Sequence, residues 1–532
     1  MKDVTISPAA KSRCVFAVKL IAFVCVLAMV LNICGTIMDG GKSSTENSSS
    51  LQQIPRNSID VLWMGSSHVY AGIIPQYLYD TTGITSTMAS GHGLDVNASY
   101  WQLKEILRKQ DPKVVVVDIY SVGGPYVYAD SMRDAVMRHP DNMHPGGFPY
   151  NMTTSAARWI PLLSPNKIPA IIDTYRLTKA RGEAYFSLTN VHDSYFDITR
   201  KNFDFYAGEN AFAPSFGYKY MNRTTPEELL QPFPFGEDPS DYQMYYYWSF
   251  TDEQLEQVQL EEFMAYDIQR LMDLSKKKGF ELVFCSIPYF ANDAERKLFA
   301  QVEEMAAEND IAFVGMDDIV IDDPELFDDM GHLNYEGAVI NTDFWAEYLT
   351  EHYDLEDRRE STDARYAPWR EGEESYLQAD TVGTLDQLES LTETLEAVAT
   401  LGDDYIITFM ITGDVYEGFS YDDYDLLIEM GLDEEAVDEW FNTGTGVFTA
   451  VLRGGETMHT FFDPDAGDFA VTCDVDGFKV GLEKEGEIMG WSVDGTRPSS
   501  IQTGLNLTVF CKSTALSPYA RCFDLTEIYF EE

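Results

Sequence analysis

An uncharged apolar segment near the N-terminus constrains this chain more than any other feature of its sequence. The stretch Leu20–Met38 (LIAFVCVLAMVLNICGTIM) contains no charged side chain. At a rise of about 1.5 Å per residue, a helix of this length crosses a hydrocarbon core about 30 Å thick. We therefore predict a membrane anchor at residues 15–38. A signal sequence has a similar composition, but no small-x-small cleavage site ends this segment, which favours an uncleaved anchor.

The charges around this segment predict its orientation. Cationic side chains precede it, at Lys2, Lys11, Arg13 and Lys19. The residues that follow it carry little positive charge. The positive-inside rule then makes residues 1–14 a cytoplasmic tail and places the rest of the chain outside the cell. The polar, Ser-rich residues 39–55 are typical of a flexible linker between an anchor and a domain.

The charge balance excludes one large class of partners. The chain has 37 Lys and Arg against 88 Asp and Glu, a net charge of −51. Nucleic-acid binding requires a basic face, so we exclude it. An acidic surface suits a neutral glycan or an acyl group better than a polyphosphate, although a solvated surface without substrate meaning is the simpler interpretation. The cysteines show no metal-ligand spacing, so we predict neither metal nor cofactor.

Short apolar runs alternate with helical stretches between residues 56 and 355. The runs are Asp60–Met64, Ile84–Met88, Lys113–Ile119, Glu281–Ser286 and Ile311–Gly315. One long helix is expected to open at Thr251 and to end in a cluster of lysines. The repetition predicts an α/β domain with a mostly parallel sheet, in which ligands bind at the carboxyl ends of the strands. The Pro-, Gly- and Tyr-rich interval 120–250 is interpreted as an insertion.

A second domain is predicted beyond a break in the apolar pattern. Residues 356–375 are dense in charge and are interpreted as a linker. Residues 376–532 contain helical stretches and then short alternating segments, which predict a smaller, β-rich, sandwich-like domain. Cys511 and Cys522 lie symmetrically about a loop, so a hairpin would place them opposite one another. They are then either a disulfide formed outside the cell or two free thiols.

Two distant motifs contain candidate catalytic side chains. Gly65-Ser66-Ser67-His68 follows the first predicted strand, and His332 follows the last predicted strand of the same sheet. Both therefore reach one rim of the sheet. A serine becomes a nucleophile when an imidazole takes its proton, and a carboxylate orients that imidazole. Asp329 precedes His332 on the same loop, so we predict a triad of Ser67, His332 and Asp329.

Neighbouring residues offer alternatives to this triad. Ser66 is the alternative nucleophile and Asp328 the alternative carboxylate. His68 is more typical of a hydrogen bond at a helix start than of catalysis. Asp118 and His192 are polar groups for which we expect structural roles.

A GxS motif after the first strand together with a DxxH motif before the last helix resembles the SGNH/GDSL hydrolase superfamily. The segments GSSHVY, SGHGLDVNASYWQL and HLNYEGA are similar to its membrane-anchored branch, which includes the teichoic-acid D-alanyl transfer protein and the alginate O-acetylation proteins. The resemblance covers residues 58–350. It implies a three-layer α/β domain with Ser67 as nucleophile, His332 as general base and acid, and Asp329 as the orienting carboxylate.

The same resemblance implies an oxyanion hole. Its donors would be the backbone N–H groups of Ser67 and Gly91, with Gly93 as second choice. The superfamily also has an Asn after the third strand, where this chain reads YSVGGP. The hole is then either smaller or completed from the insertion.

The C-terminal part resembles the domain of the interleukin-like inducer of epithelial-mesenchymal transition. The similar residues are the segment YIITFMITGD and, near the end of the chain, Gly504, Leu505, Asn506, Phe523 and Asp524. This resemblance covers about residues 400–530. It implies a compact β-sandwich without catalysis of its own, which contacts carbohydrate or acts as a packing or spacer module.

Together these features predict a membrane-tethered, extracytoplasmic SGNH-type O-acyltransferase. Ser67 would take an acyl group as an ester and pass it to a hydroxyl of a cell-envelope or secreted glycan. The resemblance implies a polytopic membrane O-acyltransferase as partner. The alternatives are a glycan O-acyl esterase with the same triad and a non-catalytic glycan-binding or assembly protein.

Overall fold

The chain forms two compact units in the computed structural model, residues 1–218 with 223–372 and residues 219–222 with 373–532. Apart from isolated residues, the structure describes residues 8–39, 54–91, 94–123, 160–178, 248–321, 323–370, 390–412, 419–444, 446–465, 468–485, 488–493, 504–511 and 519–523. The division at residue 372 falls within the stretch 356–375 that the sequence predicts as a boundary.

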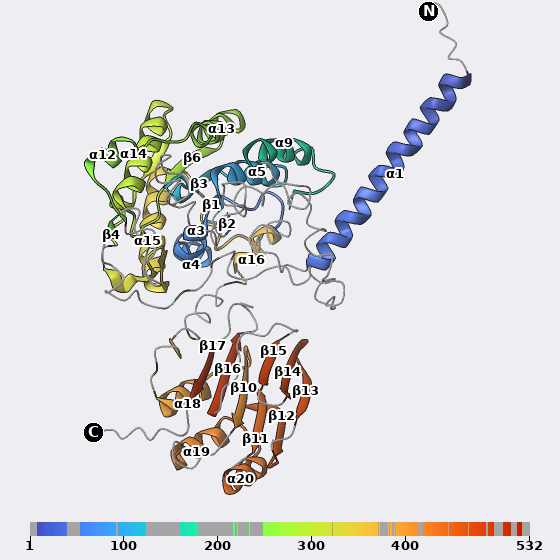
Figure 1. Ribbon diagram of the computed structural model, residues 1–532, viewed down its shortest axis with the longest axis vertical. Coiled ribbons are helices and arrows are strands. Elements are labelled where there is room, and N and C mark those ends of the chain that lie inside the picture. Colours follow the sequence, from blue (N-terminus) through green and yellow to red (C-terminus); the bar gives the residue numbers. More distant parts are fainter. Residues whose placement is uncertain are drawn as a thin grey trace, which may run out of the picture. The chain divides into compact units, whose positions relative to one another are not determined.

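An N-terminal helix, α1 (Pro8–Asp39), carries the predicted anchor (Figure 1). Its stretch Ser12–Gly35 is long and apolar enough to cross a membrane. Large apolar side chains point outward along it, and Phe16 and Phe23 are both more than three-fifths exposed. The apolar helix is confirmed, and its orientation remains a prediction. Most of the predicted linker 39–55 lies outside the described residues.

Five parallel strands form the sheet of the first unit, in the order β2-β1-β3-β6-β7. They are β1 (Val61–Gly65), β2 (Ser86–Ser90), β3 (Val114–Asp118), β6 (Glu281–Cys285) and β7 (Ala312–Val314). Each overlaps one of the predicted apolar runs. The prediction of a mostly parallel α/β sheet is therefore confirmed.

Helices cover both faces of this sheet (Figure 1). One group is α5 (Val96–Ile106), α13 (Glu262–Lys278) and α14 (Asp293–Glu308), and the other is α3 (Ser67–Gly72), α4 (Pro75–Thr82) and α15 (Tyr335–His352). Leu62 and Met64 share a core with the first group. Trp63, between them, packs edge-on against Trp345 of α15 at 5.2 Å. Burial on both faces explains why these strands are continuous apolar runs.

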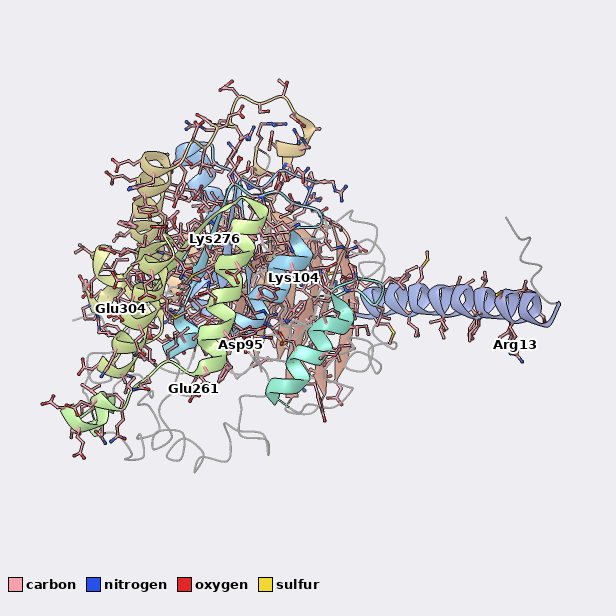
Figure 2. The ribbon with its side chains drawn as sticks, turned by 90° about the horizontal axis from the view of Figure 1, so that it is seen from above. Arg13, Asp95, Lys104, Glu261, Lys276 and Glu304 are labelled. Carbon is pink, nitrogen blue, oxygen red and sulfur yellow. The ribbon has the colours of Figure 1, made fainter. Side chains whose placement is uncertain are left out.

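The helix predicted to open at Thr251 is interrupted. Thr251 caps α12 (Asp252–Glu256) through a capping box with Gln254, as predicted, but helical structure stops there and resumes at α13. The break inserts Val258, which is 1% exposed, into the core. The lysines do gather at the end of α13, where they complement the helix dipole. Figure 2 shows α5 and α13 side by side, with Asp95 at the start of α5 and Lys276 near the end of α13.

The remaining described elements of the first unit are short. They are α6 (Tyr120–Gly123), α9 (Lys167–Thr178), α16 (Ala367–Arg370), β4 (Phe233–Pro234), β5 (Trp248–Ser249), β8 (Phe327–Asp329) and β9 (His332–Leu333). The pair β8 and β9 is an antiparallel hairpin.

The prediction of a linker at residues 356–375 is wrong for most of that stretch, which packs on the first unit. The guanidinium of Arg358 donates two hydrogen bonds to the carboxylate of Asp60, at 3.0 and 3.1 Å. Trp369 is fully buried, and its Nε1–H donates to the carbonyl of Ser86 in the edge strand β2. Arg358, one of the charges that suggested a solvated linker, is thus paired with Asp60 at the start of β1.

Replacing Trp369 by Ala tests this correction. Trp369 also stacks on Phe216, with ring centroids 4.9 Å apart. Truncating a buried Trp costs about 3–5 kcal/mol of unfolding free energy, and we expect that loss in urea titrations monitored by far-UV circular dichroism. Val320→Ala is the control, since Val320 is 80% exposed and such sites change stability by about 0.5 kcal/mol or less. Equal stability of the two variants would restore the linker interpretation.

The second unit has a five-stranded antiparallel sheet, in the order β12-β11-β10-β16-β17, and a three-stranded sheet, β13-β14-β15. Its strands are β10 (Tyr405–Thr412), β11 (Val447–Arg453), β12 (Glu456–Asp463), β13 (Phe469–Val475), β14 (Phe478–Glu485), β15 (Ile488–Val493), β16 (Gly504–Cys511) and β17 (Tyr519–Phe523). Its helices are α18 (Leu391–Ala399), α19 (Tyr421–Glu429) and α20 (Glu434–Thr443). The second sheet shares one core with the main sheet, and these helices share the other.

The register of the final hairpin separates the two cysteines that the sequence places symmetrically. Cys522 lies opposite Asn506, and Cys511 lies opposite Tyr405 on the other side of β16. Positions 506 and 511 of a strand are about 17 Å apart, well beyond the Cα separation of about 7 Å that a disulfide allows. The prediction that they face one another is wrong, and Cys522 is a free thiol.

Candidate active site

The predicted nucleophile lies where β1 ends and α3 begins. Gly65 closes the strand with φ of +146°, and a Cβ there would lie 2.9 Å from the Cβ of Asp118. Only glycine fits this close approach without strain. Ser66 caps α3, because its hydroxyl accepts a hydrogen bond from the backbone N–H of His68. Ser67 is the first helical residue and is 4% exposed.

The predicted base lies on the β8–β9 hairpin. Asp329 and His332 are partners across the hairpin turn. The carboxylate of Asp329 accepts the backbone N–H of Gly331 at 2.8 Å, which folds the turn back on itself. Asn334 follows at once as the N-cap of α15 and donates to the carbonyl of Glu325. The ring is therefore held by a tight turn on one side and a capped helix on the other.

Contacts between α15 and the segment after the nucleophile bring the two motifs together. The side-chain amide of Asn341 in α15 donates to the carbonyl of Gly72, at the end of α3. The hydroxyl of Thr342, also in α15, accepts the backbone N–H of Ile74 at 3.1 Å. Because α15 begins next to His332 and α3 begins at Ser67, these hydrogen bonds fix the position of the His332 motif relative to the Ser67 motif.

Ser67, His332 and Asp329 form one continuous hydrogen-bonded chain. His332 Nδ1 lies 2.8 and 2.9 Å from the two carboxylate oxygens of Asp329. An ionised carboxylate only accepts hydrogen bonds, so Nδ1 carries the proton and Nε2 is left as an acceptor. Ser67 Oγ lies 2.8 Å from Nε2 and donates to it. The three predicted residues thus stand in the order that nucleophilic catalysis requires.

Electrostatics favours this arrangement. Burial by itself would raise the pKa of Asp329, but the hydrogen bond and charge of His332, with the backbone N–H groups of Gly331 and His332, lower that pKa below its ordinary value. Asp329 is therefore an anion at neutral pH, as an orienting carboxylate must be. The neighbouring Asp328, the alternative carboxylate, is buried.

Asp118 supports the turn that presents Ser67. It lies at the end of β3, where its carboxyl accepts the hydroxyl of Ser66 at 3.4 Å and the backbone N–H of Ile287 at 3.3 Å. Burial raises the pKa of Asp118 to about 7, against the opposing effect of its backbone hydrogen bonds. These contacts agree with the structural role predicted for Asp118. They also engage the hydroxyl of Ser66, the alternative nucleophile, in a hydrogen bond with Asp118.

The two predicted oxyanion donors, the backbone N–H groups of Ser67 and Gly91, differ in their hydrogen bonding. The Ser67 backbone N–H lies in the first turn of a helix, where such groups lack an intrahelical partner. The backbone N–H of Gly91 donates instead to the carbonyl of Gly65 at 3.2 Å. Gly91 is therefore not a free donor in this structure, and that prediction is wrong because the β2–α5 connection folds back onto β1. Gly93 lies outside the described residues.

An aromatic cluster beside the triad was not predicted. The ring of His68 stacks on Tyr120 with centroids 3.8 Å apart, meets Tyr289 edge-on at 4.7 Å and lies 5.3 Å from the ring of His332. Tyr120 follows β3 and Tyr289 follows β6. Their positions just after two predicted strands were the available signal, since the carboxyl ends of parallel strands share one rim. The hydrogen bond expected at the helix start belongs to the backbone of His68, not to its ring.

Other predicted groups have no place in this site. His192 lies outside the described residues. Within the part of the chain that the structure describes, no three His, Cys, Asp or Glu side chains are grouped so as to hold a metal ion.

No family model, curated protein or solved structure matches this chain. The family resemblance seen in the sequence therefore stays an expectation.

Proposed function

We propose that this protein is an SGNH-type serine acyltransferase, tethered to the membrane with its catalytic domain outside the cell. The observation that carries the proposal is the 2.8 Å contact between Ser67 Oγ and His332 Nε2, together with the carboxylate of Asp329 on the opposite ring nitrogen. A hydroxyl, an imidazole and an ionised carboxylate in this order are the parts of an acyl-enzyme mechanism.

The proposed reaction has two halves. Ser67 attacks the carbonyl carbon of an acyl ester while His332 takes its proton, and the leaving alcohol then receives that proton from His332. In the second half, His332 removes a proton from the acceptor hydroxyl, which attacks the Ser67 ester and carries the acyl group away. Asp329 holds the ring in one tautomer through both halves and stabilises the imidazolium.

A glycan hydroxyl of the cell envelope or of a secreted polymer is the proposed acceptor. The net charge of −51 disfavours anionic polymers. The apolar helix α1 supports a location at a membrane, where a polytopic membrane O-acyltransferase would deliver acyl groups to Ser67. A glycan O-acyl esterase uses the same residues with water as acceptor.

A non-catalytic glycan-binding protein is the second candidate. The observation that favours it is the backbone N–H of Gly91, which is used by Gly65 and so does not serve an oxyanion. The chain also reads YSVGGP where similar enzymes have an Asn. An incomplete oxyanion hole would leave a triad without turnover.

Mass spectrometry of the full chain after exposure to an activated acetyl ester distinguishes these candidates. The acyltransferase proposal expects one acetyl group on the peptide that contains Ser67, released as a sugar O-acetyl ester when an oligosaccharide is added. Release as free acetate whether or not a sugar is present identifies the esterase. Absence of any adduct or turnover, with measurable glycan binding, would leave the non-catalytic candidate and refute acyl chemistry at this site.

A further inference from the structure

Among the residues that the structure describes, two buried nitrogen atoms beside Ser67 have no hydrogen-bond partner. They are Nδ1 and Nε2 of His68, a residue that is 1% exposed. A buried polar group without a partner lowers stability, and native proteins keep few of them. An unpaired polar group at a substrate-binding rim has a simple explanation, which is that the substrate supplies its hydrogen-bond partner.

The position of the ring agrees with that role. His68 is adjacent to the nucleophile in the chain, and its ring lies 5.3 Å from the ring of His332, between Tyr120 and Tyr289. The stacked contact with Tyr120 and the edge-on contact with Tyr289 hold the ring in place. Neither ring nitrogen has a hydrogen-bond partner among the described residues, so both can bond to another group.

The ring is also uncharged. Burial, and after it the charge of His332, lower the pKa of His68 well below its ordinary value. A neutral imidazole carries one N–H donor and one acceptor nitrogen. It can donate a hydrogen bond without adding a second cation that would oppose the protonation of His332 during attack by Ser67.

Building on the proposed function, we propose that His68 is an oxyanion-hole donor, whose ring N–H and the backbone N–H of Ser67 together bind the carbonyl oxygen of the acyl ester. His68 would then supply the oxyanion donor that Gly91 does not, because the Gly91 N–H is bonded to the carbonyl of Gly65. It would also replace the Asn that the chain lacks after β3. Histidine side chains serve as such donors in other enzymes, and a neutral imidazole polarises a carbonyl effectively.

The step balances without a further reactant. Ser67 Oγ forms a bond to the acyl carbon, its proton moves to His332 Nε2, and the carbonyl π electrons move to the oxygen that His68 and Ser67 bind. When the carbonyl re-forms, the bond between the acyl carbon and the oxygen of the leaving alcohol breaks. The oxygen of the leaving alcohol then takes the proton from His332. His68 keeps its own proton throughout.

His68→Phe in the full chain tests the proposal. Phenylalanine keeps the aromatic packing and removes both unpaired nitrogens, so we expect a melting temperature equal to or above that of the wild type. Turnover of an activated acetyl ester should fall roughly 10²- to 10³-fold, as for other lost oxyanion donors. His68→Gln retains a side-chain N–H and should recover part of this loss. His459→Phe is the matched control, because His459 in the second unit also has an unpaired Nε2 and should leave turnover unchanged.

The possible outcomes distinguish the proposed role of His68 as an oxyanion donor from the proposed acyltransferase function. Turnover of His68→Phe within about threefold of the wild type, where a lost donor costs at least a hundredfold, overturns the role of His68 alone. A lowered melting temperature with no recovery in His68→Gln makes the residue structural and also overturns it. A wild-type protein that neither turns over the ester nor acquires an acetyl group on Ser67 refutes the proposed function itself, and this role with it.

Discussion

Ser67→Ala is expected to reduce turnover of an acyl ester by roughly 10⁴-fold or more, because the variant has no atom to carry the acyl group. Residual activity would come from the oxyanion donors and from substrate binding. The fold should persist, since Ala tolerates the first turn of α3. Initial rates with an activated acetyl ester, and labelling by a fluorophosphonate, measure the effect.

Ser66→Ala is the matched control for that variant. It removes a neighbouring hydroxyl that caps α3 and donates to Asp118. Loss of a helix cap costs about 1 kcal/mol of stability, so we expect a lower melting temperature with turnover within about tenfold of the wild type. The reverse pattern, with Ser67→Ala active and Ser66→Ala inactive, would transfer the nucleophile to Ser66.

Asp329→Asn is expected to lower turnover by about 10⁴-fold while preserving the shape of the site. An amide can donate to His332 Nδ1, which then loses its proton to Nε2. A protonated Nε2 cannot accept the proton of Ser67, so the nucleophile is not activated. Measurement of kcat/KM for the same ester, with circular dichroism to check the fold, tests this expectation.

Asp328→Asn distinguishes orientation of the ring from a general effect of charge on the hairpin. The two substitutions remove the same charge from adjacent residues, and Asp329 is the carboxylate that bonds to His332 Nδ1. We expect Asp328→Asn to keep turnover within about threefold of the wild type, because it leaves the hydrogen bonds between Asp329 and His332 in place. Equal losses in both variants would contradict the assignment of Asp329 as the orienting group.

The triad was predictable because its geometry follows from topology. Parallel strands with short apolar runs must lie in a sheet buried on both faces, and residues after the ends of those strands share a rim. Ser67 directly follows β1, and the hairpin that holds His332 follows β7 along the chain, so both motifs are expected at one rim. The side-chain contacts of Asn341 and Thr342 then align the two motifs. The spacing of Asp329 and His332 on one loop then supplied the third group.

The oxyanion hole was not predictable in the same way. Whether the Gly91 N–H is free depends on how the β2–α5 connection folds back on Gly65. Whether the nitrogens of His68 find partners depends on two tyrosines from distant segments. A sequence motif gives the residue type at each position, but it does not show which atoms of that residue already have hydrogen-bond partners.

Similar reasoning applies outside the site. Residues 356–375 have the composition of a linker. Arg358 nevertheless forms an ion pair with Asp60, and Trp369 donates a hydrogen bond to Ser86 in the edge strand β2. Cys511 and Cys522 are symmetric in sequence, yet the hairpin register pairs Cys522 with Asn506. In the first case the partners lie far along the chain, and in the second the register of one hairpin decides the outcome.

The amino-acid sequence by itself determined the apolar N-terminal helix, the order of strands and helices in the first unit, and the three residues that meet at its rim. Those features depend on local periodicity and on the direction of strands, which nearby residues encode. The tertiary structure alone decided which backbone and side-chain groups beside Ser67 remain free to bind a ligand. That question depends on hydrogen bonds and packing between segments that are separate in the sequence, such as Gly91 with Gly65 and His68 with Tyr120, and no local pattern encodes these pairings.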